Sequence, residues 1–398
     1  MKFRLGINYW PASKAMDWWQ RFEADEVRAD FGQIRAAGFD SVRIFLLWED
    51  FQPEPECVSE RALRSLMDVA NAAAAQQLSV LVTFFVGHMS GVNWIPPWAL
   101  EAGRPSNRFR TIANGRIVRA APRNWYSDSP ILRAQALLAR EVAGLLRAHP
   151  ALWAYDLGNE NSNCMQPPSR DSAVAWLETI AGAIRSVDSH HPITLGLHLE
   201  DLEEDRRLGP QEAAQVCDFL CMHGYPMYAR WAGSAEDERL LPFLGLVTRW
   251  LGGRDVLFEE FGAPAVRSIE SGASALVLEE QQAARFTRRA LDALHRFGFP
   301  GALVWCFSDY APSLWNRPPL DEAPHERHFG LWRSDGSAKP ALAEIQRFVG
   351  AGRLQSPERL DWIDISPHEF YRDPSANLRR LYRKFCECYA EEEVPCPR

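Results

Sequence analysis

The sequence lacks the features that mark membrane-spanning and nucleic-acid-binding proteins. No apolar stretch approaches the roughly 20 residues that a membrane-spanning helix needs. The formal net charge is -8 and the isoelectric point is near 5.8, and no block of Lys and Arg has the density of a nucleic-acid-binding surface. We therefore expect neither a membrane nor a nucleic acid among the partners of this protein.

Cysteine is sparse, and its spacing resembles neither a zinc site nor a small disulfide framework. The residues are read as ordinary thiols: Cys57, Cys164, Cys217, Cys221, Cys306, Cys386, Cys388 and Cys396. The opening segment MKFRLGIN has neither the apolar core nor the cleavage site of a signal peptide. We expect a cytoplasmic protein that needs no metal or cofactor, and its oligomeric state is not indicated.

The sequence does contain a repeated alternation of short apolar runs and helical patterns. The apolar runs are residues 3–8, 41–46, 79–85, 152–157, 193–197, 219–223, 256–260 and 302–307. Helical patterns lie between them, at 26–37, 61–77, 131–147, 171–187 and 279–297. Near-continuous apolar runs are typical of parallel strands that are covered on both faces. The alternation predicts an α/β fold, the (β/α)8 TIM barrel.

The length of 398 residues fits one such barrel with insertions. We expect a catalytic barrel over residues 1–350 and a short helical extension over 351–398, packed on the outside of the barrel. Two long loops interrupt the pattern, at 87–129 and 308–333, and both are rich in aromatic residues. Because long loops in compact domains are usually functional, we expect them to form walls of a cleft.

Two carboxylates, Glu160 and Glu260, come directly after strand-like apolar runs. Parallel barrels gather their chemistry at the C-terminal ends of the strands, so segments 100 residues apart can place their acids over one pocket. An acid in such a position is either paired or functional, since an unpaired buried charge costs several kcal/mol. One carboxyl group to protonate and one to attack is the equipment of a glycosidase.

Other polar residues stand at the ends of the predicted strands in a recognisable order. The set is Asn8, Arg43, His88, Asn159-Glu160, His223-Gly-Tyr225, Glu260-Phe-Gly and Trp305. From Arg43 onward it resembles the active-site pattern of glycoside hydrolase family 5, within the clan of retaining (β/α)8-barrel glycosidases, clan A. The resemblance covers residues from about 3 to 350.

The resemblance implies a role for each of these residues. Glu160 is similar to the acid/base, and Glu260 to the nucleophile. The remaining roles follow in the same way: Arg43 and Tyr225 hold the nucleophile ionised, Asn159 meets the sugar 2-hydroxyl, His88 and His223 bond hydroxyls or the acid/base, and Trp305 floors the subsite where cleavage occurs.

Elementary chemistry requires similar parts. An attacking carboxylate must be ionised, and a guanidinium and a phenol hydroxyl beside it lower its pKa. The acid/base must hold a proton at neutral pH, which a nearby negative charge and aromatic walls favour. Retention needs a carboxyl separation of about 5–5.5 Å, and inversion needs about 6.5–9.5 Å.

Neighbouring residues compete for these roles. Glu259 precedes Glu260, and because side chains alternate along a strand, only one of them should point into the barrel. The family pattern selects Glu260, which leaves Glu259 facing the helix layer or a neighbouring loop, in an ion pair. Asn159 and Glu160 are both expected to face the sugar, which requires a twist or a bulge at the strand end.

The supporting residues also have structural interpretations. His88 and His223 could be neutral core histidines, and Arg43 could pair with Glu49 or Asp50. Flat aromatic faces stack on sugar rings, and Trp is abundant, at 15 residues. The candidate sugar platforms in loops are Trp94, Trp98, Trp125, Trp231 and Trp315.

The predicted function is a retaining glycosidase, with exo-acting β-mannosidase activity on oligosaccharides favoured. Alternatives within the class are an endo-β-mannanase and a cellulase-like β-glucanase. A metal-dependent barrel hydrolase could use His88, His223, Asp156 and the glutamates, although paired His-x-His and His-Glu-x-x-His motifs are absent. A sugar-binding protein without catalysis is a further alternative, but binding alone needs no acid at the anomeric carbon.

Overall fold

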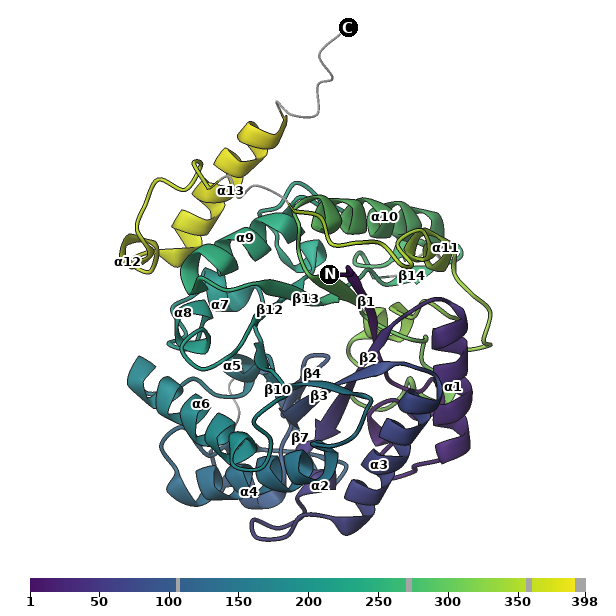
Figure 1. Ribbon diagram of the computed structural model, residues 1–398, viewed down its shortest axis with the longest axis vertical. Coiled ribbons are helices and arrows are strands. Elements are labelled where there is room, and N and C mark those ends of the chain that lie inside the picture. The colour runs from purple at the N-terminus through teal and green to yellow at the C-terminus, as the bar shows by residue number, and fades with distance from the viewer. Residues whose placement is uncertain (105–107, 270–273, 356–359, 391–398) are drawn as a thin grey trace, which may run out of the picture.

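The computed structural model describes residues 1–104, 108–269, 274–355 and 360–390, without the side chains of 389 and 390. Eight parallel strands form its main sheet, in the order β11-β10-β3-β2-β1-β16-β13-β12. Their bounds are β1 Arg4–Asn8, β2 Ser41–Leu47, β3 Ser79–Val86, β10 Leu152–Asn159, β11 Ile193–Gly196, β12 Leu220–Gly224, β13 Val256–Phe261 and β16 Gly301–Val304. The ring closes between β11 and β12, where His223 N donates to Leu197 O at 2.9 Å. The predicted (β/α)8 barrel is confirmed (Figure 1).

Helices surround the strands, as Figure 1 shows. The principal ones are α1 Ala24–Ala36, α3 Glu60–Ala75, α4 Ser129–Leu146, α6 Arg170–Arg185, α9 Leu240–Gly252, α10 Glu280–Arg296 and α11 Pro340–Gln346. Side-chain caps fix where several of them begin: Ser59, Asp128 and Ser169 accept hydrogen bonds from the first turns of α3, α4 and α6. Helix α9 is missing from the predicted set because it is apolar almost all round, which hides the helical period.

Short helices occupy several connections. They are α2 Trp48–Phe51, α5 Asn161–Cys164, α7 Glu200–Glu203, α8 Pro210–Ala213 and α12 Pro367–Phe370. Helix α5 begins directly after the strand that ends at Asn159, and α7 follows β11. Both therefore lie at the C-terminal end of the barrel, where the chemistry is expected.

The interior of the barrel has an apolar part and a polar part. The apolar part is a separate core cluster of Leu81, Ala154, Cys221, Leu257 and Leu303, drawn from five strands. Further along the same strands stand Asp156, His223 and Glu259, which are almost completely buried. The change from apolar to charged residues along the strands puts the ionisable groups near their C-terminal ends.

The long segment after β3 is built from small sheets. One has the order β4-β5-β7-β8 (His88–Met89, Val92–Trp94, Arg110–Ala113 and Arg116–Val118), and β6 Leu100–Ala102 pairs with β9 Ala120–Pro122. A further pair, β14 Ala265–Val266 and β15 Leu278–Glu279, follows β13. These pairings satisfy backbone groups that a bare loop would leave to solvent.

After the barrel, α12 and α13 Pro374–Ala390 lie beside α9 (Figure 1). The ring of Tyr382 lies 4.9 Å from that of Phe243 in α9, and its hydroxyl donates to Asp237 at 2.6 Å. Residues 391–398 of the expected extension, with Cys396, lie outside the described residues. The other seven cysteines are free thiols.

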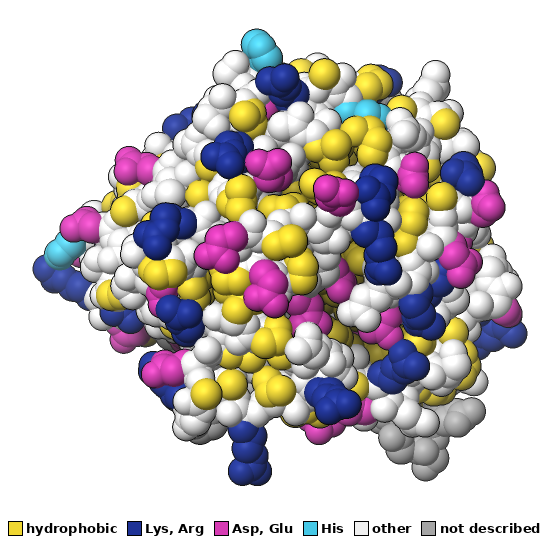
Figure 2. All heavy atoms as spheres, turned by 90° about the horizontal axis from the view of Figure 1, so that it is seen from below, with side chains coloured by type: hydrophobic (Ala, Val, Ile, Leu, Met, Phe, Trp, Pro, Cys, Tyr) yellow, Lys and Arg dark blue, Asp and Glu magenta, His cyan; other side chains and the backbone are white. Residues whose placement is uncertain are grey.

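Two features of the described part of the chain bear on partners. None of its helices combines the length and the apolar character that crossing a membrane requires. On the face drawn in Figure 2, both Lys or Arg and Asp or Glu side chains are present.

Candidate active site

A cavity of about 470 Å³ opens at the C-terminal ends of the strands. Glu160 and Glu260 both line it, from the ends of β10 and β13. Its remaining walls come from loops after β3, β11, β12 and β16, and include Arg108, Glu200, Tyr228 and Glu326. Side chains far apart in the sequence are thus brought to one pocket, as the barrel topology predicts.

Irregular backbone turns several neighbouring side chains toward this pocket. The pairing of β10 with β11 shifts register between Asp156 and Asn159, and Glu160 then has a φ of 47°, in the left-handed region. Such a φ is uncommon for a residue other than glycine, and it occurs preferentially at functional positions. Because alternation is broken here, Asn159 and Glu160 both line the cavity.

The two carboxyl groups are close together. One oxygen of Glu160, one oxygen of Glu260 and one ring nitrogen of His223 lie within 4.8 Å of one another. Inverting glycosidases need a separation of about 6.5–9.5 Å to admit a water molecule, whereas retaining ones use about 5–5.5 Å. The spacing matches the shorter arrangement.

Arg43 contacts Glu260 directly. Its Nη1 lies 2.6 Å from Glu260 Oε1, and its Nη2 lies 2.8 Å from Asp156 Oδ2. Glu49 and Asp50, the alternative partners considered for Arg43, bond elsewhere: Glu49 accepts from Asn114 N and Asp50 accepts from Gln20. The guanidinium is completely buried, so its charge acts in a medium of low dielectric constant.

Glu259 does not face the helix layer, which corrects the expectation from strand alternation. Its carboxylate lies inside the barrel, 3.3 Å from Arg43 Nε and 3.5 Å from His223 Nε2. The physical reason is a register shift between Met222 and His223 in the pairing of β12 with β13. A bulge of this kind turns consecutive side chains to the same side. The expectation that Glu259 is paired agrees with these contacts.

Tyr225 lies on the other oxygen of Glu260. Its hydroxyl donates to Glu260 Oε2 at 2.8 Å, so the carboxylate is held by a phenol on one side and a guanidinium on the other. Burial raises the pKa of Glu260, the charges of His223 and Arg43 and the bond from Tyr225 oppose that rise, and the Glu160 charge adds to it. The net pKa lies above its ordinary value.

Glu160 is surrounded by nitrogen atoms. His223 Nδ1 lies 2.9 Å from its Oε1, Asn163 Nδ2 donates to its Oε2 at 3.1 Å, and His88 Nε2 lies 3.8 Å from Oε2. Burial would raise the pKa of Glu160, but the charges of His198, His223 and His88 outweigh it and lower the pKa. The pKa of Glu260 is thus raised and that of Glu160 lowered, whereas the sequence predicted the opposite for both. The reason is that the sequence does not reveal how many imidazoles meet at Glu160.

His223 holds a proton between the two carboxylates. Burial opposes its charge, but Glu260, Glu160 and Glu259 raise its pKa to about 9. Its Nδ1 lies 2.9 Å from Glu160 and 3.6 Å from Glu260. In the free protein a proton therefore resides on His223, one hydrogen bond away from Glu160. His88 differs, since burial lowers its pKa and its Nδ1 lies 2.8 Å from Asn93.

Asn159 and Trp305 line the pocket, and the polar atoms of Asn159 are already used within the protein. Its amide donates to His88 O at 2.9 Å and accepts from Arg43 at 3.0 Å. The ring of Trp305 lies 5.8 Å from that of Phe45, near perpendicular. Asn8, one of the polar strand-end residues, bonds to Arg43 at 3.3 Å and to Glu259 O at 3.0 Å.

The five loop tryptophans expected as sugar platforms do not line this pocket. Among the described residues that line the pocket, the only tryptophan is Trp305. Trp94 and Trp125 are buried, at 7% and 4% exposure, in the main core. Trp315 donates to Tyr310 O at 2.9 Å, while Trp98 and Trp231 pack on Trp48 and Tyr382. Aromatic loop residues also build cores, and the sequence alone does not separate the two uses. The aromatic walls are instead Phe109, Tyr225, Tyr228 and Phe329.

Several pocket residues were missed. His198 lies 2.9 Å from Asp201. Burial opposes the charge of His198, but the charges of Asp201 and Glu160 raise its pKa to about 10. In the sequence, His198 directly follows the apolar run 193–197, which is the same signal that revealed Glu160. Glu326 and Arg108 come from the two long aromatic-rich loops, where no local pattern singles out these two residues.

The donor set of Glu160, His223 and Glu260 has the number of ligands that a metal ion needs. Its chemistry fits a metal poorly, because Arg43 already holds Glu260 at 2.6 Å and His223 is protonated near neutral pH. A cation would have to displace that proton and lie close to a buried guanidinium. The arrangement fits a proton-sharing cluster better.

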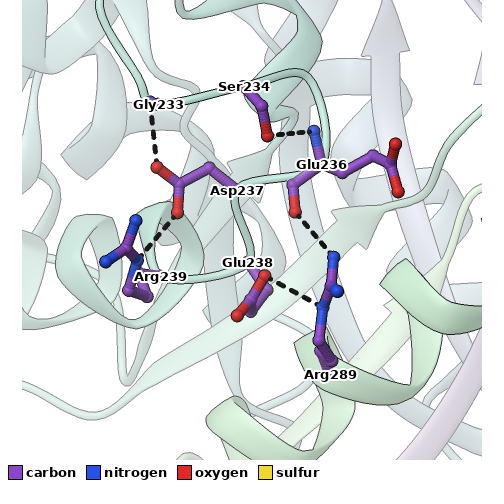
Figure 3. Close-up of a pocket in the computed structure, with 7 residues that line it drawn as sticks. All are labelled: Gly233, Ser234, Glu236, Asp237, Glu238, Arg239 and Arg289. Atoms are coloured by element: carbon purple, nitrogen blue, oxygen red, sulfur yellow. Dashed lines mark hydrogen bonds and ion pairs between the residues drawn. The ribbon is translucent and has the colours of Figure 1, made fainter. Parts of the chain in front are cut away.

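A second hollow lies away from the two acids, around the loop before α9 (Figure 3). Asp237 accepts from Gly233 N at 2.9 Å and from Arg239 at 3.1 Å, and Arg289 lies 3.1 Å from Glu238. These charges are paired with one another and with Tyr382 of α13. They hold a loop and the C-terminal helix in place.

Comparison with known proteins gives a consistent result, although no protein-family model matches the chain. A putative mannan endo-1,4-beta-mannosidase 5 of Oryza sativa subsp. japonica is 24% identical over 339 residues, which cover 75% of this chain and 65% of that protein. The chain thus spans slightly less than two thirds of that relative.

Solved structures share the fold. A GH5_18 protein of Streptomyces cattleya, in complex with Manβ1-4GlcNAc, has a TM-score of 0.81 at 23% identity and covers 98% of this chain and 92% of its own. The exo-beta-1,4-mannosidase Op5Man5 of Opitutaceae bacterium strain TAV5 has a TM-score of 0.71 at 27% identity, over 87% of this chain and 59% of its own. In fold and in sequence, the chain is thus similar to (β/α)8-barrel glycosidases of glycoside hydrolase family 5.

Proposed function

We propose that this protein is a retaining β-mannosidase that removes single sugars from the ends of oligosaccharides. The observation that carries the proposal is the separation of the two acids, whose nearest oxygens lie within 4.8 Å. At that distance no water fits between the anomeric carbon and Glu260, so the carboxylate itself attacks.

In the first step, Glu260 attacks the anomeric carbon while Glu160 donates a proton to the departing oxygen. A covalent glycosyl-enzyme forms and the aglycone leaves as an alcohol. The Arg43 and Tyr225 contacts, at 2.6 and 2.8 Å, favour the ionised form of Glu260 that the attack requires.

In the second step, Glu160 takes a proton from water as that water attacks the anomeric carbon, and Glu260 departs. Glu160 needs a proton at the start of each cycle. The proton on His223 Nδ1, 2.9 Å from Glu160 Oε1, moves to Glu160 when substrate covers the pocket and the charge on Glu160 becomes costlier. The second step leaves Glu160 protonated again, and this proton returns to His223 when the product leaves.

The relatives support mannose as the sugar. The rice protein is named a mannan endo-1,4-beta-mannosidase, the Opitutaceae protein an exo-beta-1,4-mannosidase, and the Streptomyces structure holds Manβ1-4GlcNAc. A β-mannosyl unit linked to a second sugar is therefore the substrate class that we propose. Cytoplasmic location remains a prediction of the sequence, which cell fractionation would test.

Exo action is supported by contacts between the loop after β3 and the loop after β16, both of which contribute residues to the pocket wall. Arg110, after β3, forms two hydrogen bonds of 2.8 and 2.7 Å with Asp321, in the loop after β16. Ser90, also after β3, donates to Glu326 of the same distant loop at 2.9 Å. Loops joined in this way support a pocket that is closed on this side, as action at a chain end requires.

Hydrolysis of 4-nitrophenyl β-mannoside, followed by proton NMR of the first product, tests the proposal. We expect β-mannose to appear before its anomer and the 2-deoxy-2-fluoro-β-mannosyl fluoride label to be found on Glu260. An α-mannose first product, or a label elsewhere, would contradict the mechanism. Chain-end action predicts mannose as the sole early product from mannohexaose, and release of internal fragments would identify an endo enzyme.

A further inference from the structure

Glu326 is a third carboxyl group in the wall of the same pocket. It belongs to the short 3-10 helix Pro324–His328, after β16, and it is 7% exposed. Nothing in the two-step mechanism uses it. Burial raises its pKa to about 7, against the opposing bonds from Ser90 and Tyr228, and the charges of Glu260 and Glu160 add to the rise.

The partners of Glu326 are hydroxyl groups. Ser90 Oγ donates to its Oε2 at 2.9 Å, and Tyr228 OH donates to its Oε1 at 3.3 Å. Within the described part of the chain, no Lys or Arg lies within 4.0 Å of it, and the one nitrogen in range is His325 Nε2 at 3.5 Å. Burial lowers the pKa of His325, so that imidazole is neutral at pH 7. A buried carboxyl group with hydroxyl partners in place of a cation is unfavourable for stability alone.

The place of Glu326 relative to the two acids indicates which part of a substrate it meets. Residues bonded to Glu160 lie on one side: Asn163 holds both Glu160 and Arg206, and His198 lies beside them. Because Glu160 protonates the departing oxygen, that side receives the leaving group.

Trp305, Phe329 and Tyr228 line the pocket together with Glu326, and contacts through Tyr225 put Phe329 and Tyr228 on the side of Glu260. The ring of Tyr225, which bonds to Glu260, lies 5.9 Å from Phe329 and 5.8 Å from Tyr228. This side receives the sugar that Glu260 attacks. Ser90, after β3, and Glu326, after β16, bound the pocket on this side.

Given the proposed function, on which this step rests, we propose that Glu326 binds a hydroxyl group at the non-reducing end of the terminal sugar. A carboxylate accepts hydrogen bonds from neighbouring hydroxyls, and charge-assisted O–H···O⁻ bonds are about twice as strong as neutral ones. In a longer chain one of these hydroxyls carries the next sugar, which Glu326 and its loop exclude. Glu326 is thus a specificity-determining residue for chain ends.

The test compares Glu326→Ala with the wild type on 4-nitrophenyl β-mannoside and on its 3-deoxy, 4-deoxy and 6-deoxy analogues. Removing a bond to a charged group should lower kcat/KM about 10- to 150-fold on the parent glycoside. For one or more of the deoxy analogues, the kcat/KM of the wild type should be lower than on the parent glycoside by a similar factor. The kcat/KM of Glu326→Ala should differ little between that analogue and the parent glycoside. The kcat/KM of Glu326→Gln on the parent glycoside should lie between that of the wild type and that of Glu326→Ala.

Glu280→Gln is the matched control, because Glu280 is buried but pairs with Arg333 outside the pocket. It should leave the ratios between parent and analogues unchanged. Equal losses by Glu326→Ala on all four glycosides, or no loss at all, would overturn the inference. The wild-type rate on the parent glycoside and the label on Glu260 test the proposed function separately.

Discussion

The guanidinium of Arg43 lies 2.6 Å from the carboxylate of Glu260, and both side chains are almost completely removed from solvent. The same guanidinium contacts Asp156 and Glu259. One guanidinium thus contacts three buried acids, two of which also lie near the protonated His223. Because these groups are buried, stability and activity both depend on this arrangement.

Arg43→Met should destabilise the protein by about 3–5 kcal/mol, since it leaves buried carboxylates without their cation. Urea denaturation of the variant and the wild type would measure the change. Arg64→Met is the control, because Arg64 is exposed and pairs with Glu60 at the surface; it should stay within about 0.5 kcal/mol. Equal stability of Arg43→Met and the wild type would contradict the network.

Glu160→Ala should reduce turnover of β-mannosides with poor leaving groups by about 10²–10⁴-fold and spare activated aryl glycosides in the bond-cleaving step. The reason is that a good leaving group departs without a proton. Steady-state and burst kinetics with a series of aryl mannosides would measure it. Glu178→Ala, at an exposed position of α6, serves as the control. Equal losses across the series would remove Glu160 from the role of acid.

Tyr225→Phe removes the hydroxyl that donates to Glu260 at 2.8 Å. The hydrogen bond favours the ionised carboxylate, so its loss raises the pKa of Glu260 further and moves the acidic limb of kcat/KM to higher pH. We expect a drop of about 10- to 150-fold at pH 7. Tyr382→Phe loses a comparable bond to Asp237 outside the pocket and should leave the profile unchanged. An unshifted acidic limb in Tyr225→Phe would argue against this role.

The pH profile of the wild type should reveal His223. With a pKa of about 9, His223 loses its proton as pH rises through that value, and kcat/KM should fall with it. In His223→Gln this limb should disappear from the profile, together with much of the activity. His368→Gln changes an exposed histidine and should retain the wild-type profile. A wild-type profile that stays level to pH 10 would contradict the proton on His223.

His198 should make stability depend on pH. Its pKa is about 10 in the folded protein, against an ordinary value of 6.5 for an exposed histidine, so the folded form holds a proton that the unfolded form releases above about pH 6.5. Its stabilising contribution is fully present below that pH and is lost as pH rises through 10. The free energy of unfolding of His198→Gln should therefore decline less between pH 7 and 10 than that of the wild type. Parallel declines would contradict the shift.

Much of the fold was determined by the sequence itself. The eight apolar runs match the eight strands to within a few residues, because parallel strands covered on both faces need continuous apolar segments. The ends of those runs also revealed Glu160 and Glu260, since a polar residue directly after a buried strand has few other reasons to be there. Alternation along strands failed at Glu259 and Glu160, where bulges and a left-handed residue turn the backbone.

Tertiary structure decided what surrounds those acids. The sequence does not show that His198 and Glu326, 128 positions apart, enter one pocket, because loops carry no periodic pattern that fixes their side chains in space. For the same reason, composition could not show that the loop tryptophans lie outside the pocket, whereas the family pattern had selected Trp305, which lines it. Local patterns of polarity specify strands and helices, whereas the charge balance at Glu160 and Glu260 depends on distances that arise only when the barrel closes.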